Sequence, residues 1–77
     1  MAGRIKHKYR LEKAMEYIKK FADEDGIFDI RAAVIYCNES GNRYASTNAQ
    51  QLTNLLRSRW DIVSSGKPFI WIYNGER

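Results

Sequence analysis

The sequence predicts a single α+β domain in which three helices are followed by a C-terminal β-hairpin, with a short strand near residues 27–28. Two observations carry this prediction. Apolar residues recur at helical spacing in three segments of the first 60 residues. After residue 60 the pattern changes to short runs rich in aromatic and β-branched residues. With 77 residues, 44% of them hydrophobic, the chain has the size of one domain with a small core.

Residues 1–9 precede the first helical pattern, and we expect them to form a flexible basic arm ahead of a folded domain at 10–77. Four basic residues and no acidic ones occupy the first ten positions: Arg4, Lys6, Lys8 and Arg10. The first helix is predicted over 10–24, where one face carries Leu11, Ala14, Met15, Ile18, Phe21 and Ala22. Asp25-Gly26 is expected to end it.

The middle of the chain predicts a short strand and a second helix. Ile27 and Phe28 read as a brief extended segment, and Asp29 has the right side chain to cap a helix over about 30–38. Ser40-Gly41-Asn42 is expected to stop that helix.

A third helix is predicted over about 47–58. Thr47 and Gln50 have the spacing of a capping box, in which each side chain bonds the backbone N–H of the other residue. One face of this helix carries the apolar residues Ala49, Leu52, Leu55 and Leu56.

The last segment predicts a hairpin with a tight turn centred on Ser65-Gly66. That turn would place Trp60 opposite Trp71 and Ile62 opposite Phe69, pairs that stabilise a sheet well. A second apolar face remains on the same strands, formed by Val63, Ile70 and Ile72. Either the N-terminal arm or the first helix covers this face, or the face mediates self-association of the chain.

Composition narrows the function classes. The net charge is +4, and the acidic residues gather in the middle while both the N-terminal segment and the second half are basic, which favours a polyanionic partner.

Cys37 is the only cysteine and His7 the only histidine, so we expect no metal site, no cofactor and no catalytic centre. Asp23–Asp29 resembles a calcium loop, but Phe21 and Ala32 would stand at ligand positions. No apolar run suits a membrane span, and we expect a cytoplasmic protein.

The order helix, short strand, helix, helix, strand, turn, strand resembles the winged helix-turn-helix superfamily. The resemblance covers about residues 10–73 and rests mainly on the helix and hairpin at 47–73. It implies double-stranded DNA as partner, the third helix as recognition helix in the major groove, and the hairpin as a wing. The connection Glu39–Ser46 is longer than the usual turn between the two helices, which puts the usual angle between them in question.

The polar residues of the third helix support the same partner independently. None of them is acidic, and each can donate a hydrogen bond, whereas phosphate offers only acceptors. Arg43, Arg59 and Lys67 are expected to contact phosphates, Ser65 to lie at the wing tip, and Arg4, Lys6 and Lys8 to follow a groove. On the third helix and its cap the predicted contacts are Thr47, Asn48, Gln50, Gln51, Asn54, Arg57 and Ser58.

Two other functions remain open at this stage. The surplus apolar strand face would suit a protein-interaction domain with no nucleic-acid partner. Stacking on Tyr36, Tyr44 or Tyr73 would suit RNA or single-stranded DNA.

Overall fold

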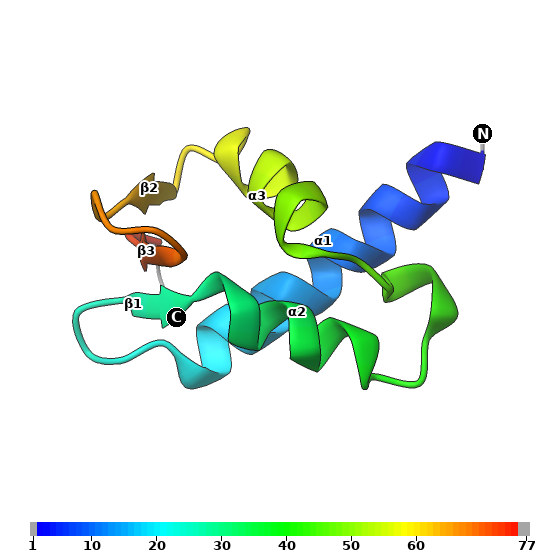
Figure 1. The fold of residues 1–77 in the computed structure, drawn as a ribbon, viewed down its shortest axis with the longest axis horizontal. Coiled ribbons are helices and arrows are strands. Elements are labelled where there is room, and N and C mark those ends of the chain that lie inside the picture. Colours follow the sequence, from blue (N-terminus) through cyan, green and yellow to red (C-terminus); the bar gives the residue numbers. More distant parts are fainter. Residues whose placement is uncertain (1, 76–77) are drawn as a thin grey trace.

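The computed structural model describes the backbone of residues 2–75 and the side chains of residues 8–75. Within that part the chain is α+β, with three α-helices, a short 3₁₀ helix and a three-stranded antiparallel sheet (Figure 1). The elements are α1 (Ala2–Phe21), β1 (Ile27–Asp29), α2 (Ile30–Asn38), η1 (Arg43–Ala45), α3 (Ala49–Arg57), β2 (Ile62–Ser64) and β3 (Ile70–Tyr73). The predicted class, element order and short strand are confirmed.

Helix α1 differs from its prediction at both ends. It begins at Ala2, so residues 2–9 continue the helix and the expected flexible arm is not a separate segment. The side chains of Arg4 and Lys6 lie outside the described residues. The helix ends at Phe21 because Asp23 turns the chain: its carboxylate accepts from the backbone N–H groups of Asp25 and Ile27, both at 2.9 Å.

The sheet has the strand order β1-β3-β2, which makes β3 its central strand. Ile27 pairs with Ile72 on one side, and Val63 pairs with Ile72 on the other. Just before β1, the carbonyl of Gly26 accepts a hydrogen bond of 2.8 Å from the Tyr73 backbone N–H. Gly26 has φ +82°, and a side chain there would overlap the carbonyl oxygen of Tyr73. This close approach of two backbones requires glycine.

The predicted hairpin register is wrong. Ile62 lies opposite Tyr73 and Ser64 opposite Trp71, while Trp60 precedes the strand and is 84% exposed. The strands are joined by a loop over 65–69 rather than by a tight turn at Ser65-Gly66. Since β3 also pairs with β1, a contact distant in sequence helps to fix its register.

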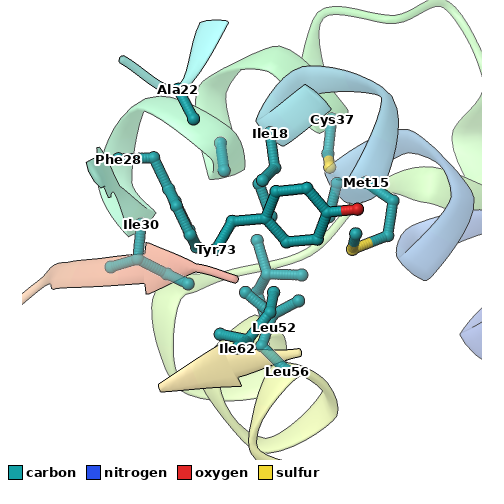
Figure 2. Packing of buried hydrophobic residues seen from close by; sticks show 12 residues of the cluster. Met15, Ile18, Ala22, Phe28, Ile30, Cys37, Leu52, Leu56, Ile62 and Tyr73 are labelled. Carbon is teal, nitrogen blue, oxygen red and sulfur yellow. The ribbon is translucent and has the colours of Figure 1, made fainter. Parts of the chain in front are cut away.

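The core forms where α1, α2, α3 and the inner face of the sheet meet. Figure 2 shows the Tyr73 ring at its centre, near Met15 and Ile18. Its buried members are Ala14, Met15, Ile18, Ala22, Phe28, Ile30, Ala33, Cys37, Leu52, Leu56, Ile62 and Tyr73. Burial raises the pKa of the Cys37 thiol to about 11, so this side chain stays protonated and packs as a small apolar group.

The cap of α2 agrees with its prediction, whereas the position of Phe21 does not. Asp29 caps α2 as predicted, and its carboxylate accepts from the Arg31 backbone N–H at 2.8 Å. Phe21, expected in the core, is 54% exposed and stacks on Tyr17 instead.

None of the helices in residues 2–75 combines the length and apolar character that a membrane crossing requires.

Candidate nucleic-acid interface

Helix α3 is capped one residue later than predicted. Asn48 is the N-cap, and its side chain accepts from the Gln51 backbone N–H at 2.9 Å. Thr47 is buried, and its backbone N–H donates to the Asn38 side chain at 2.8 Å. The capping box of Thr47 and Gln50 is therefore wrong. Thr47 leaves the predicted contact surface, while Gln50 is exposed on it.

The apolar and polar faces of α3 lie where the sequence predicts, but Ala49 and Leu55 of the predicted apolar face are only half-buried. Leu52 and Leu56 are fully buried, so they fix the helix to the core. The exposed positions of the helix and its C-cap are polar: Gln50, Gln51, Asn54, Arg57 and Ser58. The Ser58 hydroxyl donates to the Leu55 carbonyl at 2.7 Å, which occupies it in closing the helix end.

The exposed face of α3 and the loop 65–69 enclose two adjoining hollows of about 460 and 400 Å³. In Figure 1 this loop, drawn in orange, lies on the same side of the molecule as α3. Thr53, Arg57 and Phe69 line both hollows. The first is completed by Ala49, Gln50 and Asn54. The second is completed by Ser64, Gly66, Lys67, Pro68 and Trp71.

The loop 65–69 is held by hydrogen bonds of its own. The Ser65 hydroxyl donates to the Ile70 carbonyl at 2.7 Å and accepts from the Lys67 backbone N–H at 3.2 Å. Ser65 therefore shapes the loop rather than offering its hydroxyl to a ligand. The ammonium group of Lys67 is carried at the rim of the second hollow on an exposed side chain.

A third hollow, of about 280 Å³, lies on the other flank of α3. It is lined by Arg10, Gln51, Asn54 and Leu55. Arg10 reaches it from α1, and its guanidinium donates to the Ser46 carbonyl at 2.8 Å. Arg10 is not among the predicted contacts, because a helical pattern does not show which distant loop a long side chain meets.

Three of the basic residues predicted to contact DNA lie elsewhere. The Arg43 guanidinium lies 5.1 Å from the centre of the Tyr44 ring, on η1, which packs against α1. Lys8 and Arg59 line a separate, largely apolar hollow with Leu11 and Met15 of α1. Arg59 is also paired with Asp61 through two hydrogen bonds of 2.8 and 2.7 Å. The structure therefore does not bring Arg43, Lys8 and Arg59 together with Arg57 and Lys67.

The charged side chains that line the hollows around α3 are all basic. Among the described residues that line the three hollows around this helix, none is acidic, and three are basic: Arg10, Arg57 and Lys67. The nearby Asp29 is paired with Arg31 at 2.8 Å. Hydrogen bonding from Arg31 lowers the pKa of the Asp29 carboxyl, so its charge is matched by a cation. An anionic ligand would meet donors and cations over this surface.

The tyrosines proposed for stacking are placed differently. Tyr73 is buried in the core and cannot stack on a base from outside. Tyr36 packs against Tyr17, and Tyr44 stacks on Tyr9 with ring centres 5.9 Å apart. Tyr36 and Tyr44 are therefore each already in contact with another tyrosine ring of the chain.

In the described residues, no three histidine, cysteine, aspartate or glutamate side chains are grouped so that they could hold a metal ion. Comparison with protein-family models, with curated proteins and with solved structures gave no match.

Proposed function

We propose that this chain is a small winged-helix protein that binds double-stranded DNA. The observation that carries the proposal is the acid-free surface formed jointly by α3 and the loop 65–69. A polar helix face without acidic groups, whose amide and guanidinium groups can donate hydrogen bonds, suits DNA, whose outer edge is acceptor-rich phosphate. A solvated helix face of no special function would be expected to mix acids with bases.

In this proposal α3 lies in the major groove and the loop 65–69 is the wing. Asn54 and Arg57 are on the exposed face, where their planar groups could each make two hydrogen bonds to adenine and guanine respectively. Gln50 and Gln51 flank them. Lys67 on the wing and Arg10 on the opposite flank would hold phosphates and fix the register of the helix on the duplex. A regulatory or architectural role follows from such binding.

Arg57→Ala and Lys67→Ala should weaken binding in different ways. Arg57→Ala should cost about tenfold on a duplex selected from a random library and reduce the preference for it, because a lost base contact changes discrimination. Lys67→Ala should weaken all duplexes equally and reduce the slope of log K against log salt by about 0.9, since one phosphate contact is lost. Fluorescence anisotropy on the selected and a scrambled duplex, at several salt concentrations, measures both quantities.

Lys20→Ala is the matched control. Lys20 is an exposed cation on α1 and lines none of the three hollows around α3, so its loss should change neither preference nor salt slope. Equal losses from Arg57→Ala and Lys67→Ala, with the preference unchanged, would remove the base-reading role of Arg57.

A protein-binding function is the second candidate, and one observation favours it. Ile27, Ile72 and Val63 form a cross-strand row on the outer face of the sheet. Ile27 and Val63 are exposed, and Ile70 lies on the same face. A second copy of the chain could bury this row, and dimerisation would also suit a DNA-binding protein. Sedimentation of Val63→Asp beside the unmodified chain separates a dimer from a monomer.

A further inference from the structure

Phe69 is held in a conformation that phenylalanine rarely adopts. Its φ is +66°, and within the described residues it is the one non-glycine residue with positive φ. Bulky side chains are strained in this region, so the surroundings must fix it. Two contacts do so: the Phe69 carbonyl accepts from the Ile30 backbone N–H at 2.8 Å, and the Arg31 guanidinium lies 4.8 Å from the ring centre.

The ring of Phe69 is held where the two hollows beside α3 adjoin. It is 43% exposed, and together with Pro68 and Trp71 it forms the apolar part of the lining. The polar part carries the cations Arg57 and Lys67 and the hydroxyls Thr53 and Ser64. The lining of the second hollow is thus apolar at Pro68, Phe69 and Trp71 and cationic at Arg57 and Lys67.

This pattern matches a sugar–phosphate strand, in which each apolar deoxyribose lies between two anionic phosphates. We propose that Phe69 packs against a deoxyribose of the DNA strand that passes between α3 and the loop 65–69, while Lys67 contacts an adjoining phosphate and Arg57 faces the bases. The inference rests on the proposed DNA binding and adds a non-ionic contact to it. The strained backbone orients the ring toward the strand before binding, so little side-chain freedom is lost on contact.

The test uses Phe69→Ala and Phe69→Tyr in the full chain. Phe69→Ala removes the ring but keeps a side chain at the same backbone position. It should weaken duplex binding about tenfold at every salt concentration, since an apolar contact releases no counterions. Phe69→Tyr keeps the ring and should bind within about twofold of the unmodified chain. Ile35→Ala, which shortens an exposed apolar side chain on α2, should bind as the unmodified chain does. Thermal unfolding of each variant confirms that the fold is retained.

A duplex with deoxyuridine in place of every thymidine separates the sugar from the other apolar group of DNA, the thymine methyl. The loss from Phe69→Ala should be the same on both duplexes. A loss that disappears on the deoxyuridine duplex would assign the contact to a methyl group and overturn the deoxyribose inference. Unchanged binding by Phe69→Ala, or a reduced salt slope, would overturn it as well. If the unmodified chain shows no salt-sensitive duplex binding, the proposed function itself fails.

Discussion

Gly26→Ala should lower the free energy of unfolding by about 3 kcal/mol or more, a large part of the total for a domain of this size. Two costs combine. The left-handed backbone at φ +82° disfavours any side chain, and the added methyl would overlap the Tyr73 carbonyl oxygen of the central strand. Relief requires β3 to move away from the turn before β1, which breaks the hydrogen bond from the Tyr73 N–H to Gly26. Chemical denaturation followed by circular dichroism measures the change.

Gly41→Ala is the matched control for this prediction. Gly41 has nearly the same backbone angle, φ +81°, but a methyl there would meet nothing within 4 Å. Its substitution should cost only the conformational strain, about 1 kcal/mol. If both alanine variants lost the same stability, the contact between Gly26 and β3 would have no special role in holding the sheet.

Asp61→Asn should destabilise the fold by about 2 kcal/mol at neutral pH. Asp61 is 3% exposed, and its carboxylate accepts two hydrogen bonds from the Arg59 guanidinium, at 2.8 and 2.7 Å. Asparagine keeps the shape but removes the charge and one of the two acceptors, which leaves part of the guanidinium unpaired. Urea denaturation at pH 7 compares the variant with the unmodified chain.

The ion pair of Arg59 and Asp61 predicts that the stability of the fold depends on pH. Hydrogen bonding from Arg59 lowers the pKa of the Asp61 carboxyl in the folded state. Its stabilisation is therefore present above the unfolded carboxyl pKa, about 3.9, and is lost as the pH falls through the lower folded value. The difference between Asp61→Asn and the unmodified chain should shrink on acidification below about pH 4. A difference that stayed constant would mean that the ion pair does not contribute.

Asp29→Asn provides the comparison with an exposed pair. Asp29 also binds an arginine, Arg31, but these two side chains are 31% and 61% exposed, against 4% and 28% for Asp61 and Arg59. Asparagine also caps a helix about as well as aspartate. Little stability should be lost, because water already screens the pair. This variant tests whether burial, rather than the charge pair alone, makes Asp61 important.

Features that depend on side chains a few residues apart could be predicted from the sequence. The Asp29 cap follows from side chains a few residues apart and lies as predicted. The apolar stripe of α3 follows in the same way, and its members Leu52 and Leu56 are buried while Ala49 and Leu55 are only half-buried. The start of α3 does not follow in the same way, since Thr47 and Asn48 are both good caps. The hydrogen bond from Thr47 to Asn38 decides between them, and it joins residues nine positions apart.

The candidate site depends on contacts between residues distant in the sequence, which no local pattern predicts. The register of the hairpin depends on β1, more than 30 residues earlier in the chain, and the exposure of Phe69 depends on a backbone angle that phenylalanine rarely takes. Arg10 joins the α3 surface only because α1 passes beside the loop before α3. The sequence therefore indicated α3 as the helix that carries the surface. The fold adds the loop 65–69 as the second wall of the site. It also places Arg43 and Arg59 away from that site.

The most direct test of the DNA-binding proposal is the affinity of the unmodified chain for duplex DNA as a function of salt. Anisotropy with a random-sequence duplex should give binding at micromolar protein or tighter, with a slope of log K against log salt of about −2 or steeper. Unlabelled duplex should compete better than the same amount of single-stranded DNA. The absence of salt-sensitive duplex binding at micromolar protein would contradict the proposal and favour a protein-binding function for the fold.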